Sequence, residues 1–229
     1  MTPPFSPYEY FSYFFPGATV FGAFWLSTVG FPSKEPGAAA TLAVIGVAFV
    51  TGHVVAAIAS WFEPLLWGQR PGRRPDPEWG MFGRSGTYDE ADRASITEDL
   101  GVRYGSKPFR IAYNLAYTEL QQAGNDAQLK VMNQQIGFYR NMAFASALAG
   151  VIIAAESVHG NSLVPAVPWV PFFGLTTWMF IYRYRRFWRY FGDNVIRGFR
   201  GLVQPRKPDD PELAAKALHK TPPVAPTSA

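Results

Sequence analysis

The stretch that most constrains this chain is residues 38–67, AAATLAVIGVAFVTGHVVAAIASWFEPLLW. Its first two dozen or so residues are apolar apart from Thr41, Thr51, His53 and Ser60. A helix rises about 1.5 Å per residue, so a run of this length crosses a hydrocarbon core of about 30 Å. The stretch therefore predicts the central membrane-spanning helix of a small multi-span protein.

Three further apolar runs predict three more spans. Residues 10–31 carry no charge, and Pro16 lies inside them, so that helix either begins near the proline or is kinked there. Residues 141–155 extend only about 22 Å as a helix and need their flanks in the interfaces to reach across. Residues 163–182 begin with three prolines, so the regular helix is expected at or after Pro165. We predict an all-α membrane protein with four transmembrane helices.

The composition agrees with alternating apolar and polar blocks. Hydrophobic residues make up 48% of the chain, yet the mean hydropathy is −0.03 because charged residues gather between the apolar runs. The net charge of +4 is compatible with nucleic acid. The arginines flank apolar spans, however, so an anionic lipid surface is the expected partner, and no nucleic acid is. The absence of cysteine excludes disulfides and thiolate catalysis.

Five segments follow from this pattern. We expect a transmembrane hairpin at 1–67, with spans about 10–31 and 38–62, and a second hairpin at 139–182. Between them, 68–138 should form a cytoplasmic loop and helices, with helices near 88–100 and 107–123. Residues 183–204 predict a basic amphipathic helix, which either extends the fourth span or lies on the inner surface. Residues 205–229 are a biased tail that we expect to be disordered.

Positive charge predicts the orientation. Arginines and lysines are dense in 68–138 and after 182, whereas the two turns that join the paired spans carry one lysine between them. Both termini should therefore face the cytoplasm of a multi-pass protein in the bacterial inner membrane. The N-terminus lacks the positive n-region of a signal peptide, so the first span should be retained.

Few polar residues lie within the predicted spans. His53 is placed well inside the second span, with Ser60 and Glu63 near the same face, and a His–Glu pair can relay protons. The alternative, which we favour, is that His53 fixes helix packing. Glu63 should pair with Arg140 or Arg183 at the inner boundary. No metal or cofactor is expected, because too few ligands share one side of the membrane.

Two further sets of residues have predicted roles. Small residues four apart make a seam for close helix contact, at Ser146, Gly150 and Ala154. The basic segment after the fourth span supplies candidate lipid-surface residues, namely Arg185, Arg186, Trp188, Arg189, Arg197 and Arg200.

The motifs YFFPG, GHVVAAIASWFE, QQIGFYRN and RYRRFWRYFGDNVIRGF together resemble a group of uncharacterised bacterial four-span membrane proteins. The layout is also similar to small four-helix membrane effectors of phage defence. These likenesses imply a fold but no activity. We expect a non-enzymatic membrane component, either a homo-oligomeric pore-forming or membrane-perturbing effector, or the anchor of a cytosolic partner. The alternative is an intramembrane enzyme or proton-coupled transporter that uses His53 and Glu63.

Overall fold

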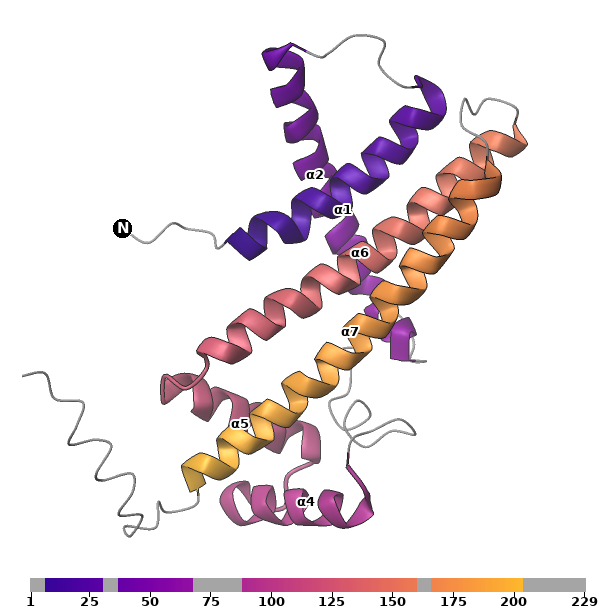
Figure 1. Ribbon diagram of the computed structural model, residues 1–229. Helices are drawn as coiled ribbons and strands as arrows, with labels where there is room; N and C mark the ends of the chain where they lie inside the picture. The colour runs from indigo at the N-terminus through magenta and orange to yellow at the C-terminus, as the bar shows by residue number, and fades with distance from the viewer. Residues whose placement is uncertain (1–6, 31–36, 68–87, 160–165, 204–229) are drawn as a thin grey trace, which may run out of the picture.

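The computed structural model is all-α and describes residues 7–30, 37–67, 88–159 and 166–203 (Figure 1). Within these ranges it contains six α-helices and one 3-10 turn: α1 (Pro7–Thr28), α2 (Ala38–Phe62), η1 (Glu63–Trp67), α4 (Glu90–Tyr104), α5 (Phe109–Gln122), α6 (Ala127–Val158) and α7 (Ala166–Val203). The expected loop at 68–87, the turns at 31–36 and 160–165, and the tail at 205–229 lie outside the described residues.

The two longest helices, α6 and α7, form an antiparallel hairpin that runs the length of the protein (Figure 1). At one end α1 packs against α6, and α2 crosses α1. At the other end α5 packs against α7, and α4 packs against α5. The helices of the middle segment therefore pack at the end of the α6–α7 hairpin that is away from α1 and α2.

The two ends are packed differently. The α4–α5 end holds one large apolar core to which the front half of α6 and the back half of α7 contribute, including Ile96, Leu100, Tyr113, Leu120, Met132, Ile136, Tyr184, Val195 and Phe199. We call this end, with helices α4 and α5 and the adjoining halves of α6 and α7, the helical module. Among the described residues, the α1–α2 end has two small clusters, built on Val20, Val55 and Ala145 and on Ala23, Ala149 and Ile153. Most of its large apolar side chains therefore point outward.

Helices α1 and α2 cross at a point where their backbones touch. A Cβ atom built on Gly17 lies 1.7 Å from the carbonyl oxygen of Ala48, and one built on Gly52 lies 1.8 Å from that of Tyr13. Only glycine fits at these two positions. In α1 the close contact is at Gly17, whereas a Cβ on Gly22 meets nothing within 4 Å.

Helix α1 begins at Pro7 and continues through Pro16, so it does not start at the internal proline. A proline has no N–H, so Pro16 cannot donate to the carbonyl four residues earlier, which is that of Ser12. The buried Asn141 of α6 donates from Nδ2 to this carbonyl at 3.1 Å. A side chain from another helix thus replaces the missing backbone donor.

Local signals explain the ends of the shorter helices. Asp89 caps α4 by accepting a hydrogen bond from the N–H of Asp92 at 2.8 Å, as expected for an acidic N-cap. The helix passes Gly101 and stops at Gly105, whose φ of 75° favours glycine. Gly124, with a φ of 71°, follows α5 and precedes α6.

Two of the described helices are long and apolar enough to span a membrane. They are Ala38–Leu66, with a mean hydropathy of 2.3, and Ala127–Val158, with 1.5. Only 28% and 33% of their most apolar windows are buried inside the protein. The core helix of a water-soluble protein would be mostly buried, so this exposure favours lipid as the surroundings. Helices α1 and α7 fall short of the same criterion, and both are rich in Tyr, Trp and Pro.

The expected amphipathic helix at 183–204 is not a separate element. Helix α7 continues without a break from Ala166 to Val203. Of the two alternatives, extension of the fourth apolar run is the one observed. Its stripe of apolar residues, which includes Phe191, Val195 and Phe199, is buried in the core of the helical module and is not available to a lipid surface.

Candidate functional site

The polar cluster around Glu63 lies where the apolar halves of the long helices end. Glu63 opens η1, directly after α2. Its carboxylate accepts a hydrogen bond from Nη1 of Arg140 in α6 at 2.9 Å and another from the hydroxyl of Tyr184 in α7 at 2.5 Å. The side chains of Glu63 and Arg140 are only 13% and 19% exposed. This partly buried ion pair sets the position of η1 against α6 and α7.

The cluster extends to the remaining long helix through neighbouring side chains. Arg140 donates from Nε to Oδ1 of Asn141 at 3.2 Å, and Asn141 in turn donates to the carbonyl of Ser12 in α1. The cluster thus joins all four long helices at one level. We call these residues the boundary network: Ser12, Glu63, Arg140, Asn141 and Tyr184.

The expected contact between Glu63 and Arg140 is present, but the other expected partner is not part of it. Arg183 is exposed, and the neighbouring Tyr184 contacts Glu63 in its place. Sequence reasoning missed Tyr184, since nothing separates it from the other tyrosines. Asn141 carried a signal, because it is an amide at the head of an apolar run.

His53 lies apart from this network. Its side chain is exposed, and its ring stacks on that of Tyr13 with centroids 4.0 Å apart and meets Phe49 edge-on at 4.7 Å. Ser60 is also exposed and donates to the carbonyl of Ala57 in its own helix. Glu63 is bonded to Arg140 and Tyr184, so the structure does not bring His53 and Glu63 together as an acid–base pair. The contacts of His53 are those of helix packing between α1 and α2.

The predicted small-residue seam is used within the chain. Ser146 is buried, Gly150 and Ala154 are half-buried, and a Cβ on Gly150 would lie 3.2 Å from Cβ of Phe173 in α7. The closest contacts of α6 with α1 use a neighbouring face, at Ala145 and Ala149, which are fully buried.

The predicted lipid-surface residues have several different positions. Arg185 donates twice to the carbonyl of Leu66, at 3.0 and 2.5 Å, and so ties α7 to η1. Arg186 lies over the ring of Tyr190, with 5.4 Å between its Cζ and the ring centroid. Arg189 is half-buried and donates to the Arg185 carbonyl at 3.4 Å.

Two more of these arginines stabilise the helical module. Arg197 pairs with Asp193 one turn away at 2.8 Å, and the hydroxyl of Tyr88 donates to the same carboxylate. Arg200 pairs with Asp99 of α4 at 2.6 Å. Arg200 therefore joins α7 to α4, whereas the side chain of Arg197 is 75% exposed and pairs within α7.

A second cluster in the module joins α4 to α5. Arg103 and the hydroxyl of Tyr104 both donate to the carboxylate of Glu119, each at 2.6 Å. The bond from Arg103, followed by that from Tyr104, lowers the pKa of Glu119 below its ordinary value. Glu119 therefore stays ionised when the module is folded.

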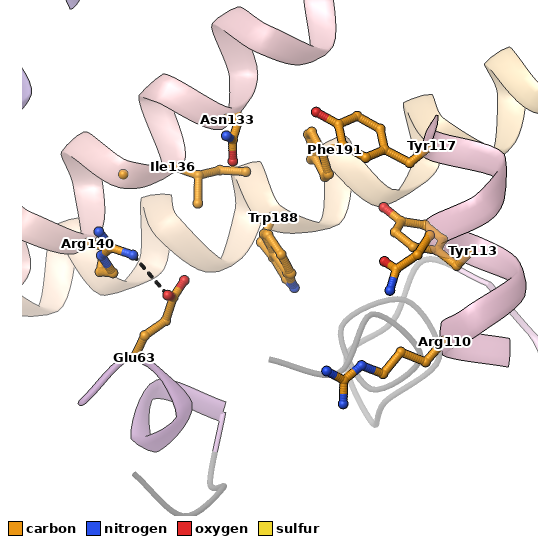
Figure 2. Close-up of a pocket in the computed structure, with 11 residues that line it drawn as sticks. Glu63, Arg110, Tyr113, Tyr117, Asn133, Ile136, Arg140, Trp188 and Phe191 are labelled. Carbon is orange, nitrogen blue, oxygen red and sulfur yellow. Dashed lines mark hydrogen bonds and ion pairs between the residues drawn. The ribbon is translucent and has the colours of Figure 1, made fainter. Parts of the chain in front are cut away.

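Beside the boundary network is a cavity of about 450 Å³ between η1, α5, α6 and α7. Figure 2 shows Glu63 and Arg140 on one side of it, the α5 residues Arg110, Tyr113 and Tyr117 on the other, and Trp188 between them. The volume lies within the usual range for small-molecule sites. Trp188, expected on a lipid surface, is instead a half-buried part of the cavity wall.

This arrangement offers hydrogen-bond donors, one ion pair and aromatic surface, but no assembled metal site. Among the described residues, no group of three or more His, Asp or Glu side chains is placed to hold a metal ion. Comparison of the chain with known protein families, curated proteins and solved structures finds no match. The resemblance to four-span bacterial proteins therefore stays a prediction from the motifs.

Proposed function

We propose that the chain is a non-enzymatic, four-span protein of the bacterial inner membrane that holds its helical module at the cytoplasmic surface as the anchor of a cytosolic partner. The observation that carries this proposal is the separation of apolar from charged surface along the same helices. The described residues 10–30, 37–62, 141–155 and 166–182 include no Asp, Glu, Lys or Arg.

The exposed surface of these segments is apolar on all four long helices. Large side chains there are half or more exposed, among them Phe24, Leu42, Val50, Val54, Val151, Leu175 and Trp178. Water makes exposure of so much apolar area costly, at about 25 cal/mol per Å², whereas lipid does not. The tyrosines and tryptophans of α1 and α7 suit the interfacial zones of a span. These features support spans for α1 and α7 as well as for α2 and α6.

The continuity of α6 and α7 favours an anchor over the other forms of membrane component. Both helices run from the apolar end into the core of the helical module without interruption. The boundary network fixes them to η1 and α1 at the level where the charges begin. The small-residue seam, which suggested a homo-oligomer, is occupied within the chain, so it gives no support to self-association. A pore-forming or membrane-perturbing homo-oligomer is the second candidate form of this membrane component.

Labelling of single cysteines tests the four spans, since the natural chain has no cysteine to interfere. We would place a cysteine at Phe24, Val50 or Leu175 in the apolar segments, and at Thr97 on the exposed surface of α4. A water-soluble, membrane-impermeant maleimide should not label the first three in intact cells or after permeabilisation. It should label the Thr97 position only after permeabilisation.

The cysteine at Leu175 in α7 gives the most decisive test of the fourth span. Leu175 is 65% exposed in the structure and would react as readily as Thr97 if α7 lay in water. Equal labelling of the two positions would reject the fourth span. Labelling of the Thr97 position in intact cells would reject the cytoplasmic location of the module.

The mass of the purified particle in detergent tests the anchor role. A single copy with a stoichiometric cytosolic protein bound to the module supports an anchor. A closed homo-oligomer supports the second form, and a strictly single chain that binds nothing contradicts both.

A further inference from the structure

The cavity beside the boundary network holds polar groups that the protein itself does not use. Within the described part of the chain, the guanidinium of Arg110, the hydroxyl of Tyr113 and the side-chain amides of Asn114 and Asn133 have no hydrogen-bond or ion-pair partner, and all four residues line the cavity. Tyr113 is 5% exposed, whereas Arg110, Asn114 and Asn133 are exposed residues at the rim of the cavity. A nearly buried side chain with a free hydroxyl at a cavity wall is typical of a binding site.

The free groups are mainly donors. A guanidinium has only donors, and a protonated tyrosine and the amide nitrogens add more. Burial raises the pKa of the Tyr113 hydroxyl, so it keeps its proton at neutral pH. The ligand should therefore be rich in hydrogen-bond acceptors.

The charge of the lining points to an anion. Among the described residues that line it, the charged ones are Glu63, Arg110 and Arg140. Glu63 and Arg140 neutralise each other in their ion pair, so the positive charge of Arg110 is left over. A guanidinium matches the geometry of a phosphate group and binds it through two parallel hydrogen bonds.

One wall of the cavity is aromatic. Trp188 and Phe191 are nearly parallel, with centroids 5.8 Å apart and 11° between their planes, and Tyr117 meets Phe191 at 5.6 Å. Figure 2 shows Trp188 and Phe191 between the Glu63–Arg140 pair and α5, which carries Tyr117 and Arg110. An apolar wall next to a free cation suits a ligand that joins an anionic group to an apolar part.

We propose that this cavity binds a phosphate-bearing group, with Arg110 and Tyr113 as its donors. The place of the cavity at the end of the apolar segments identifies the headgroup and glycerol region of an anionic phospholipid as the favoured source of the phosphate. That source rests on the proposed membrane insertion, whereas recognition of the phosphate does not. A soluble phosphate ester is the other source of the same chemistry.

Native mass spectrometry of the full chain in detergent tests the proposal without a bilayer. The probes are phosphatidylglycerol, zwitterionic phosphatidylcholine and soluble glycerol 3-phosphate. Arg110→Gln should weaken binding of the phosphate probe by about tenfold or more, because it removes a charge-assisted pair of hydrogen bonds. Tyr113→Phe keeps the packing of the ring and removes the hydroxyl, so it should weaken binding of the phosphate probe by a smaller factor.

Arg183→Gln is the matched control, since it removes one exposed arginine of α7 that does not line the cavity. Binding of phosphatidylglycerol alone supports a lipid source, and binding of glycerol 3-phosphate as well supports recognition of a soluble ester. The proposal is overturned if Arg110→Gln loses no more binding than Arg183→Gln. Phosphatidylcholine carries the same phosphodiester beside a cationic choline, so equal binding of the two lipids would overturn an anionic phospholipid as the favoured source. Neither result depends on the labelling pattern that tests the four spans.

Discussion

Replacement of Gly17 by alanine should disrupt the crossing of α1 and α2. The new Cβ would lie 1.7 Å from the carbonyl oxygen of Ala48, and Cβ atoms essentially never approach closer than 3.0 Å. The atom it meets is backbone in a helix, so no side chain can rotate away. The two helices must therefore separate by more than about 1 Å, a gap that already loses a quarter to a half of each contact's attraction.

A matched control isolates this clash. Gly22 lies in the same helix, and a Cβ there meets nothing within 4 Å. Both substitutions share the intrinsic helix gain of alanine over glycine, about 0.5–1 kcal/mol. The difference in the free energy of unfolding between Gly17→Ala and Gly22→Ala therefore measures the clash. Overpacking typically costs about 1–3 kcal/mol, and we expect a difference in that range or above it.

Unfolding by titration with SDS in mixed micelles, followed by tryptophan fluorescence, gives these free energies. Gly52→Ala should behave like Gly17→Ala, because its Cβ would lie 1.8 Å from the carbonyl oxygen of Tyr13. If Gly17→Ala unfolds at the same SDS concentration as Gly22→Ala, the backbones do not touch at this crossing and the packing of the α1–α2 end is not as described.

Two further predictions concern the boundary network and the helical module. Asn141→Ala should lower the free energy of unfolding by about 1–2 kcal/mol, because the Ser12 carbonyl loses its hydrogen bond from Asn141. The loss should be smaller in a Pro16→Ala background, which restores a backbone N–H. The same SDS titration measures both losses, and equal losses in the two backgrounds would refute this link. Glu119→Gln should destabilise the module at neutral pH. The difference from the wild type should disappear as the pH falls below 4.5 toward the lowered pKa of Glu119, because the wild-type carboxylate then also becomes neutral. Thermal melts at several pH values measure this, and a cost that does not change with pH would contradict a role for the charge.

The helical elements were largely predictable because their signals are local. The apolar runs and the helices of the middle segment all appear within a few residues of their predicted places. The end of α4 was less predictable, because Gly101 and Gly105 are both possible stops and only the positive φ of Gly105 separates them. Local sequence also does not show whether a basic amphipathic stretch lies on lipid or packs on other helices.

The candidate site was predictable only in part. A carboxylate and an arginine at the ends of apolar runs indicate an ion pair, so Glu63 and Arg140 were found. Tyr184 was missed because its role depends on which way α7 is rotated, and that rotation is set by the burial of residues such as Val195 and Phe199 far along the helix. The cavity was missed because its walls come from four segments that are distant in the sequence.

The sequence by itself determined that this protein is built from long apolar helices with charged ends, since the length and hydropathy of each run depend only on neighbouring residues. Only the tertiary structure decided which side chains meet. It placed Asn141 against the carbonyl of Ser12, four residues before Pro16, set His53 apart from Glu63, and left Arg110 beside a cavity with no partner among the described residues. These outcomes depend on helix rotation and crossing, which arise from the packing of all the helices together and are not encoded in any one of them.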